Sequence, residues 1–366
     1  MGESSHPSAI SYRNTLMKAA VLHEFKQPVV IEEVERPQPG TEDVLIRVDA
    51  CGVCHSDLHV ADGDWPQFTK IVKRPLILGH EIAGQVVEKG AAVRDVGVGD
   101  RVGVPWLHWS CGRCDFCRGG DENLCVAQKI TGVTVDGGFA EYVKAPASHT
   151  EKIPPALSPV EAAPLFCAGV TVYRALKQAQ IRPSERLAVF GIGGLGHVAV
   201  QIGVALGAEV TALDVSDEKL SLAKSLGALA TLNASAPDAV KTIRSRGGAQ
   251  VAMVTSASRS AYELAFNCLR PTGTLLVVGL PAENVCFPPI MMAAKEARIR
   301  ATTVGTRQDL REVLAMAAAG KVRCQVAARP LVEANEALEE LRRGQVTGRI
   351  ALTPSRLEQS QSSAAG

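Results

Sequence analysis

Residues 187–214, LAVFGIGGLGHVAVQIGVALGAEVTALD, decide the fold of this chain. They predict an apolar strand, a glycine-rich turn, a helix over 195–206 and a second strand ending at Asp214. Glycine permits a tight turn and lets backbone N–H groups approach a pyrophosphate at the helix N-terminus, where the helix dipole favours negative charge. A glycine motif alone is as often a plain turn. The order of strand, turn, helix and strand therefore carries the prediction of a dinucleotide site, at Gly191, Gly193, Gly194, Leu195 and Gly196.

The carboxylate that closes the second strand indicates which dinucleotide binds. Asp214 follows the glycines by about 20 residues, a position from which a carboxylate accepts hydrogen bonds from the adenosine ribose hydroxyls. NADP carries a phosphate at this place, and Asp214 would repel it. The sequence therefore favours NAD over NADP.

The sequence predicts two kinds of domain, with a change of pattern near Pro159. After Pro159, apolar strands at 187–190, 209–213, 251–255 and 275–278 alternate with helices at 195–206, 218–226 and 261–269, which is typical of a parallel, doubly wound sheet. Before it, short β-rich runs at 18–23, 43–48, 82–88 and 100–104 are broken by glycine and proline, which indicates a mostly β domain. Helices at 308–319 and 335–343 and a strand at 349–352 are expected to return the chain to the first domain. The fold class is α/β.

Composition and charge exclude several classes of function. Apolar residues make up 46% and charged residues 21% of the 366 residues, a balance typical of an ordinary globular protein. The net charge is +1 without a basic run, so we expect no nucleic-acid partner. We also expect no membrane partner, because no apolar stretch approaches the roughly 20 residues of a membrane helix. The start of the chain does not resemble a signal peptide, which favours a cytoplasmic location.

Four of the ten cysteines lie close together in the sequence. Cys111, Cys114, Cys117 and Cys125 have the spacing of a closed, tetrahedral zinc site, and such a site is structural. A cluster of incidental cysteines is the alternative, and it is disfavoured at this density in a reducing compartment. A nucleic-acid-binding zinc ribbon is disfavoured by the neighbouring RGGDENLC, residues 118–125, which is not basic.

Other candidate metal ligands are dispersed. They occur in CGVCHSDLH (51–59), LGHEIAGQV (78–86) and PLFCAGVTVY (164–173). Spacing cannot join these segments, and each cysteine or histidine taken alone is more simply explained as a core residue. A zinc-peptidase motif is excluded, because Gly84 stands where His-Glu-x-x-His needs its second histidine.

With these motifs, and with GDWP (63–66) and GRIAL (348–352), the chain resembles the zinc-containing alcohol dehydrogenases of the medium-chain dehydrogenase/reductase superfamily from about Met17 to Thr353. The resemblance implies a GroES-like, mostly β catalytic domain over 17–160 and 300–353 and a Rossmann NAD-binding domain over 161–299. Residues 1–16 and 354–366 would be a flexible extension and a flexible tail. The four-cysteine loop has no large insertion beside it, as in the microbial branch, so we expect a homo-oligomer, in particular a tetramer.

The resemblance also assigns roles near a catalytic zinc, the second of two zinc ions expected per chain. It implies that Cys54, His80 and Cys167 hold this zinc and that Glu81 lies beside it. Asp57 would orient the histidine ligand. Ser56 and His59 would relay the alcohol proton to solvent, and His55 would lie near the cofactor pyrophosphate.

For the cofactor and substrate, the resemblance implies two further sets of residues. The cofactor set adds Thr171, Lys219, Val278, Leu280 and Arg349 to Asp214 and the glycine turn. The alcohol pocket would be formed by Trp65, Trp106, Leu280 and Thr303, and the two indoles predict a narrow, apolar pocket. Thr303 is small where relatives can carry a bulkier aromatic residue, which counts against a strict preference for ethanol.

The expected reaction is the reversible, NAD-linked oxidation of a small primary alcohol to an aldehyde, with secondary alcohols and ketones left open. One alternative is an aryl or cinnamyl alcohol dehydrogenase of the same superfamily, which would more often use NADP. The other is a zinc-binding protein without enzymatic activity.

Overall fold

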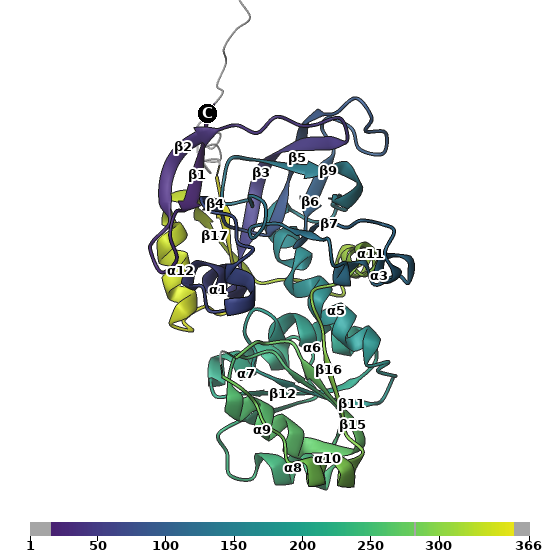
Figure 1. Cartoon of the computed structure of the whole chain (residues 1–366). Helices are drawn as coiled ribbons and strands as arrows, with labels where there is room; N and C mark the ends of the chain where they lie inside the picture. Colours follow the sequence, from purple (N-terminus) through teal and green to yellow (C-terminus); the bar gives the residue numbers. More distant parts are fainter. Residues whose placement is uncertain (1–15, 282, 355–366) are drawn as a thin grey trace, which may run out of the picture.

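The computed structural model describes residues 16–354 except residue 282. The predicted N-terminal extension and C-terminal tail lie outside the described residues, apart from Leu16, which begins the first strand, and Pro354, which follows the last. Two units, each built around its own β-sheets, lie one above the other in Figure 1, and one cluster of buried apolar residues continues from one unit into the other. None of the helices described combines the length and the apolar composition needed to cross a bilayer.

The lower unit in Figure 1 is a six-stranded parallel sheet in the order β13-β12-β11-β14-β15-β16. Its strands are β11 (Arg186–Phe190), β12 (Glu209–Asp214), β13 (Ala230–Asn233), β14 (Ala249–Val254), β15 (Leu269–Val277) and β16 (Arg298–Ala301). Its helices are α6 (Gly196–Ala205), α7 (Asp217–Ser225), α8 (Ala239–Ser245), α9 (Arg259–Cys268) and α10 (Pro289–Lys295). Strand order reverses between β11 and β14, which is the position at which doubly wound sheets bind their ligands.

Local sequence explains how this unit begins. The strand β11 is a short apolar run, four of whose five residues are buried, and Gly191 ends it with a φ of 92°, which favours glycine. A Cβ on Gly196 would lie 1.8 Å from the carbonyl oxygen of Gly191, so only glycine lets the helix start so close to the turn. The helix α6 is buried on most sides, as expected for a helix packed between a sheet and a neighbouring unit.

The upper unit is mostly β. Its largest sheet has the order β10-β6-β5-β3-β18-β17, with β9 also paired to β3, and a three-stranded sheet has the order β2-β1-β4. The strands before residue 160 are β1 (Leu16–Leu22), β2 (Val30–Glu35), β3 (Asp43–Val53), β4 (Leu76–Ile77), β5 (Glu81–Lys89), β6 (Arg101–Val104), β7 (Leu107–Trp109), β8 (Lys129–Ile130), β9 (Tyr142–Pro146) and β10 (Glu151–Lys152). Short helices join them: α1 (His55–Asp62), α2 (Pro66–Thr69), α3 (Asp115–Arg118), η1 (Glu122–Leu124) and η2 (Ala147–His149).

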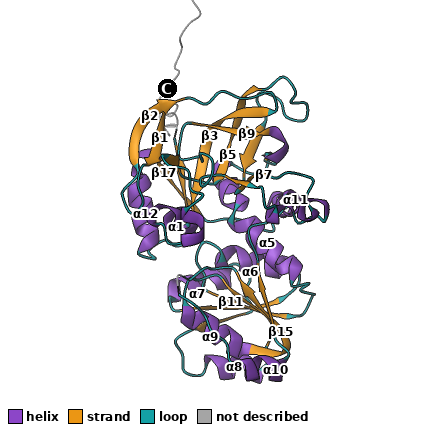
Figure 2. Ribbon diagram, viewed as in Figure 1, coloured by secondary structure: helices purple, strands orange, loops and turns teal. Residues whose placement is uncertain are grey.

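The C-terminal part of the chain returns to the upper unit. The strand β18 (Arg349–Thr353) pairs antiparallel with β3 and parallel with β17 (Val326–Pro330). Helices α11 (Arg307–Ala318) and α12 (Ala334–Arg342) accompany this return, and α5 (Ala168–Gln178) packs against both α11 and α6 (Figure 2). The remaining short elements are α4 (Pro159–Ala162), η3 (Ala163–Phe166) and η4 (Leu331–Glu333).

The fold class predicted from the sequence is confirmed. The predicted strands and helices correspond to β1, β3, β5, β6, β11, β12, β14, β15, β18, α6, α7, α9, α11 and α12, with ends shifted by a few residues. The boundary expected at residue 300 falls inside β16, since Arg300 and Ala301 pair with β15. The sequence did not reveal β16, because the strand has only four residues and all four are exposed.

Candidate active site

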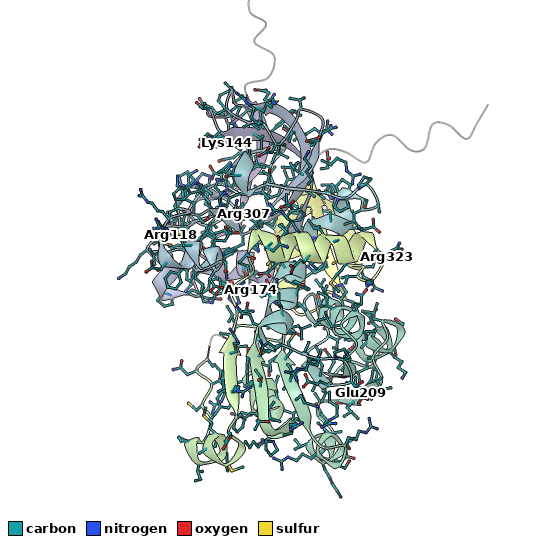
Figure 3. The ribbon with its side chains drawn as sticks, turned by 90° about the vertical axis from the view of Figure 1, so that its right-hand side faces the viewer. Arg118, Lys144, Arg174, Glu209, Arg307 and Arg323 are labelled. Atoms are coloured by element: carbon teal, nitrogen blue, oxygen red, sulfur yellow. The ribbon has the colours of Figure 1, made fainter. Side chains whose placement is uncertain are left out.

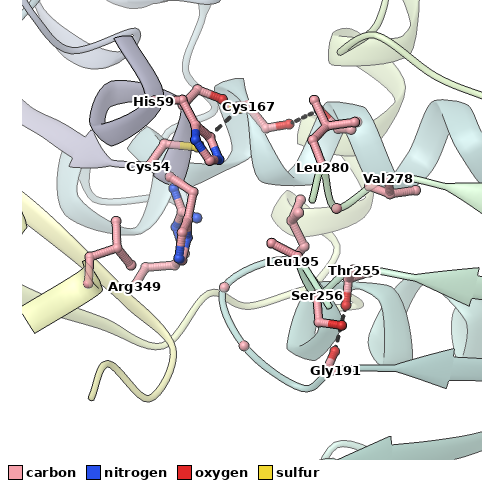
Figure 4. A pocket seen from close by; sticks show the side chains of 18 of the residues that line it. Cys54, His59, Cys167, Gly191, Leu195, Thr255, Ser256, Val278, Leu280 and Arg349 are labelled. Carbon is pink, nitrogen blue, oxygen red and sulfur yellow. Dashed lines mark hydrogen bonds between the residues drawn. The ribbon is translucent and has the colours of Figure 1, made fainter. Parts of the chain in front are cut away.

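A cavity of about 450 Å³ lies between the two units, next to the carboxyl ends of β11 and β12. Figure 4 shows Cys54, His59, Cys167 and Arg349 on one side of it and Gly191, Leu195, Thr255 and Ser256 on the other. The predicted residues that line it are Cys54, His55, Ser56, His59, Trp65, Trp106, Cys167, Thr171, Gly191, Gly193, Gly194, Leu195, Asp214, Lys219, Val278, Leu280, Thr303 and Arg349. His80, Glu81, Asp57 and Gly196 lie behind this surface and are buried.

Three elements bring the dispersed cysteines and histidine together. Cys54 is the N-cap of α1, Cys167 is the N-cap of α5, and His80 directly precedes β5. The Sγ atoms of Cys54 and Cys167 are 4.0 Å apart although 113 residues separate them in the sequence. Together with Glu81 they form a buried group whose ligand atoms all lie within 4.8 Å of one another.

The donor set of this group fits a zinc ion. Tetrahedral zinc with Zn–S bonds of about 2.3 Å places two sulfur atoms about 3.8 Å apart, close to the 4.0 Å observed. The Nε2 atom of His80 is buried and has no hydrogen-bond partner among the described residues. The hydrogen bond from the Cys167 thiol, aided by His80, holds the pKa of Cys54 well below its usual value, although burial opposes this shift. A thiolate, which is the form that binds zinc, is therefore favoured at Cys54.

Asp57 holds the histidine of this group. Its Oδ1 atom lies 2.9 Å from Nδ1 of His80, and its Oδ2 atom accepts a hydrogen bond of 2.9 Å from the backbone N–H of Cys54. Burial alone would lower the pKa of His80, but the Asp57 carboxylate raises it well above its usual value. The carboxylate thus fixes the ring with Nε2 directed away from Asp57.

Glu81 contacts a second charged residue. Its carboxylate forms an ion pair with the guanidinium of Arg349, and both side chains are buried. Burial raises the pKa of Glu81 to about 7, while Arg349 opposes the shift. The other carboxylate oxygen, Oε2, has no partner among the described residues. Arg349 therefore joins the buried group to the cavity wall at the start of β18.

The four clustered cysteines also converge. The sulfur atoms of Cys111, Cys114, Cys117 and Cys125 all lie within 4.8 Å of one another, and Sγ of Cys117 is 3.9 Å from Cys111 and 3.5 Å from Cys114. Backbone N–H groups of Arg113 and Cys114 lower the pKa of Cys111 to about 6. Such N–H···S contacts stabilise thiolates, so this loop fits a closed zinc site.

The glycine turn leaves room for a ligand at one position. A Cβ on Gly193 would meet nothing within 4 Å, whereas a Cβ on Gly194 would lie 2.7 Å from Nη1 of Arg349. The start of α6 and the Arg349 guanidinium thus border an open space at the turn. Positive charge and free backbone N–H groups suit a pyrophosphate there.

Asp214 has two roles in the geometry of this turn. Its oxygens accept hydrogen bonds from the backbone N–H groups of Ile192, at 2.6 Å, and Ser216, at 3.0 Å. The carboxylate therefore stabilises the turn and also lines the cavity. Each oxygen keeps a second lone pair with which it can accept a further hydrogen bond.

The walls near Cys54 are aromatic. The ring of Trp106 makes an edge contact with His80 at 4.9 Å, and Trp65 lies 4.7 Å from the ring of His59. His59 also forms a 2.9 Å contact between its Nδ1 atom and Oδ2 of Asp64. Asp64 was not identified from the sequence.

Sequence reasoning also missed part of the cavity wall. Phe68, Ser256, Leu341 and Val346 line it, and the hydroxyl of Ser256 is buried with no partner among the described residues. Leu341 comes from α12, which only the return of the chain through β18 brings to the site. No sequence motif includes these residues, so their place at the cavity could be found only from the structure.

Comparisons with known proteins show the family to which this chain belongs. Residues 40–155 match the model of the alcohol dehydrogenase GroES-like domain, and residues 194–319 match the zinc-binding dehydrogenase model. An alcohol dehydrogenase of Geobacillus stearothermophilus is 48% identical over 337 residues, which cover 92% of this chain and 99% of that protein. Among solved structures, the alcohol dehydrogenase of Aeropyrum pernix superposes with a TM-score of 0.86 at 38% identity, covering 92% of this chain and all of that one (100%).

An acetophenone reductase of Geotrichum candidum, solved in complex with NAD, superposes with a TM-score of 0.86 at 30% identity and covers 94% of this chain and 98% of that one. The likeness to these dehydrogenases spans both units, so it does not support a zinc-binding protein without enzymatic activity. The chain therefore belongs to the zinc-dependent alcohol dehydrogenases of the medium-chain dehydrogenase/reductase superfamily.

Proposed function

We propose that this alcohol dehydrogenase oxidises small primary alcohols to aldehydes with NAD, using a zinc ion held by Cys54, His80 and Cys167. The observation that carries the proposal is the convergence of two thiols and an unpartnered imidazole nitrogen at the cavity that the glycine turn also borders. Three ligands leave the fourth tetrahedral position for the substrate. Secondary alcohols are a second substrate class, because Thr303 is small and Leu280 is half-exposed at the cavity.

When bound, zinc supplies Lewis acidity that favours loss of the alcohol proton, and the nicotinamide accepts the hydride. The chain supplies orientation and a dry environment. Trp106 packs against His80, and Trp65 packs against His59 and Phe68, so aromatic rings line the cavity near Cys54. Such a lining excludes water and suits a short carbon chain. Glu81, paired with Arg349, balances charge beside the ligands.

The proposed proton route uses Ser56 and His59. Both line the cavity, and His59 is partly exposed, with 15% of its side chain accessible. The contact between Nδ1 of His59 and Asp64 leaves Nε2 free to accept a proton. Asp64 is itself partly exposed, so a proton on His59 has direct access to solvent.

We assign NAD to the glycine turn, with Lys219, Thr171, Val278, Leu280, His55 and Arg349 as further contacts. Asp214 favours NAD over NADP, because its negative charge at the edge of the cavity would repel the 2′-phosphate of NADP. The cinnamyl-type alternative with NADP is therefore not favoured.

The second zinc of the two proposed per chain belongs to Cys111, Cys114, Cys117 and Cys125. Four thiolates leave no open position, so this ion stabilises the loop without contacting the substrate. The reduced thiols that both sites require agree with a cytoplasmic location.

We also propose that the protein forms a homo-oligomer, in particular a tetramer. The strand β16 is an edge of the six-stranded sheet, and Ile290 and Met291 of the adjoining α10 are exposed. An unprotected edge strand beside apolar side chains suits pairing with a second copy about a two-fold axis. Light scattering on the purified protein measures the mass of the assembly, and a monomeric mass would refute this part.

The function is tested by initial rates with NAD and with NADP over linear, branched and aromatic alcohols. We expect the highest kcat/KM with NAD and short primary alcohols. Comparable rates with NADP and an aromatic alcohol would refute the proposed cofactor and substrate.

A further inference from the structure

One wall of the cavity is formed by a segment with an unfavourable backbone. Thr302, Thr303 and Val304 line the cavity after the end of β16. Val304 has a φ of 39°, in the left-handed region that a β-branched residue rarely adopts. A conformation of this kind persists only where surrounding contacts impose it.

Two residues of the four-cysteine loop contact this segment directly, and the residue before them contacts it through Arg174. The side-chain amide of Asn123 donates a 2.8 Å hydrogen bond to the carbonyl oxygen of Thr303. Glu122 accepts a 2.9 Å hydrogen bond from the backbone N–H of Arg307 and pairs with its guanidinium at 2.6 Å. Asp121 is bound to Arg174 at 2.6 Å.

Arg174 extends this link to the start of α11. Its guanidinium also pairs at 2.8 Å with Asp309, which caps α11 through Thr306. In Figure 3, Arg174 and Arg307 lie between the four-cysteine loop, which carries Arg118, and the rest of the molecule. Residues 121–123 therefore hold the segment 303–307, which contains Val304, at both of its ends: Asn123 bonds Thr303 and Glu122 bonds Arg307.

Asn123 is the member of this set that reaches the cavity wall directly. Asn123 is only 1% exposed, and its Oδ1 atom has no partner among the described residues. A buried side-chain amide whose oxygen has no hydrogen-bond partner costs free energy. The hydrogen bond from its nitrogen to Thr303 is therefore the contact that explains why an asparagine occupies this position. Two residues later, Cys125 is anchored in the cysteine cluster.

We propose that Asn123 is a positioning residue that sets the shape of the alcohol pocket by holding Thr303 and Val304, so that the four-cysteine loop controls substrate preference. This inference rests on the proposed function, because it assumes that the cavity beside Cys54 is the alcohol pocket. Removing the amide frees Thr303 and lets Val304 relax to an ordinary backbone conformation, which moves the wall.

The test compares Asn123→Ala with Asn335→Ala in the full-length, zinc-loaded protein. Asn335 is a matched control, because its amide also bonds backbone atoms, those of Val29 at 2.9 Å, but Val29, unlike Thr303, does not line the cavity. The first readout is the ratio of kcat/KM for a linear and a branched alcohol. The second is hydrogen exchange of the amides of residues 302–307, which does not depend on activity.

We expect Asn123→Ala to change the ratio by about threefold or more, since small changes in a pocket discriminate between substrates at this level. Exchange over 302–307 should rise, while the zinc content stays at the wild-type value. Asn335→Ala should leave both readouts unchanged. An unchanged ratio and unchanged exchange in Asn123→Ala, or equal changes in both variants, would overturn the proposal.

Asn123→Asp provides a second route if Asn123→Ala fails to fold. It keeps the size of the side chain but turns a carboxylate oxygen toward the carbonyl of Thr303, so the same two readouts should change. If the unmodified protein oxidises no alcohol, the proposed function fails. The exchange measurement then still decides whether Asn123 holds the segment.

Discussion

Asp57 and His80 form a buried pair in which Oδ1 of Asp57 lies 2.9 Å from Nδ1 of His80, and each side chain is 1% exposed. The pair fixes the tautomer of the histidine, because a hydrogen on Nδ1 leaves Nε2 as the atom free to bind a metal. A carboxylate in this position also raises the basicity of the ligand. The proposed zinc site thus depends on a residue that is not itself a proposed ligand.

Replacing Asp57 with asparagine should weaken zinc binding. The amide keeps the size of the side chain but loses the charge that orients His80, and losses of this kind are typically about 10- to 100-fold in affinity. Zinc retained after dialysis against graded concentrations of a chelator measures the effect. Asp64→Asn is the control and should retain zinc like the wild type; equal retention in Asp57→Asn would contradict the assignment.

Replacing Asp64 with asparagine should slow turnover without loss of metal. Its carboxylate orients His59 through a 2.9 Å contact, so we expect kcat to fall roughly threefold to tenfold, less than the roughly 100- to 10,000-fold typical of losing a proton-transfer group outright. Asp62→Asn is the matched control, because Asp62 pairs with Arg342 at 2.8 Å and does not contact His59. If Asp64→Asn and Asp62→Asn both show the steady-state rate of the wild type, Asp64 does not take part in proton transfer.

Replacing Asp214 with alanine should shift the preference from NAD toward NADP. A hydrogen bond to a charged group contributes about 1.5–3 kcal/mol, so the ratio of kcat/KM for NAD to that for NADP should fall at least about tenfold. Some stability should also be lost, because Asp214 bonds the N–H of Ile192 in the glycine turn. Glu209→Ala, at the opposite end of β12, is the control, and a ratio that changes equally in both variants would refute the role of Asp214.

The stability of the fold should decrease in acid because of His197. Burial lowers the pKa of this histidine to about 4, and its neutral ring donates from Nδ1 to the carbonyl of Gly193 and accepts at Nε2 from the N–H of Gln325. The unfolded chain therefore binds the proton more readily between pH 6.5 and pH 4. The free energy of unfolding should fall by up to about 3 kcal/mol as the pH drops through this window.

Chemical denaturation at pH 7 and at pH 4.5 tests this dependence, with His197→Gln as the comparison. Both proteins carry the same metal ligands, so acid release of zinc affects them equally. The wild type should lose more stability than the variant over this interval. An equal loss in the two proteins would show that His197 does not contribute.

The sequence predicts features that are local and leaves open those that depend on long-range packing. The glycine turn and the four-cysteine loop could be recognised because each lies within a short stretch of chain. Cys54 and Cys167 are 113 residues apart, and only the resemblance to known dehydrogenases suggested that they meet. Their 4.0 Å separation supplies the geometry that spacing alone could not.

Residues that act through packing were not predictable for the same reason. Asn123 reaches Thr303 across 180 residues, and Leu341 enters the cavity from a helix near the end of the chain. The strand β16 has only four residues, all of them exposed, so no buried apolar run marks it in the sequence. A sequence pattern records burial within an element, whereas these features depend on which elements become neighbours.

The central claim is tested most directly by the zinc content and turnover of the wild type, Cys54→Ser and Cys114→Ser. We predict two zinc ions per chain in the wild type. Cys54→Ser should retain one zinc and bind NAD but fail to produce NADH from alcohol, whereas Cys114→Ser should lose the other zinc and unfold at a lower temperature. Two zinc ions and full turnover in Cys54→Ser would contradict the account.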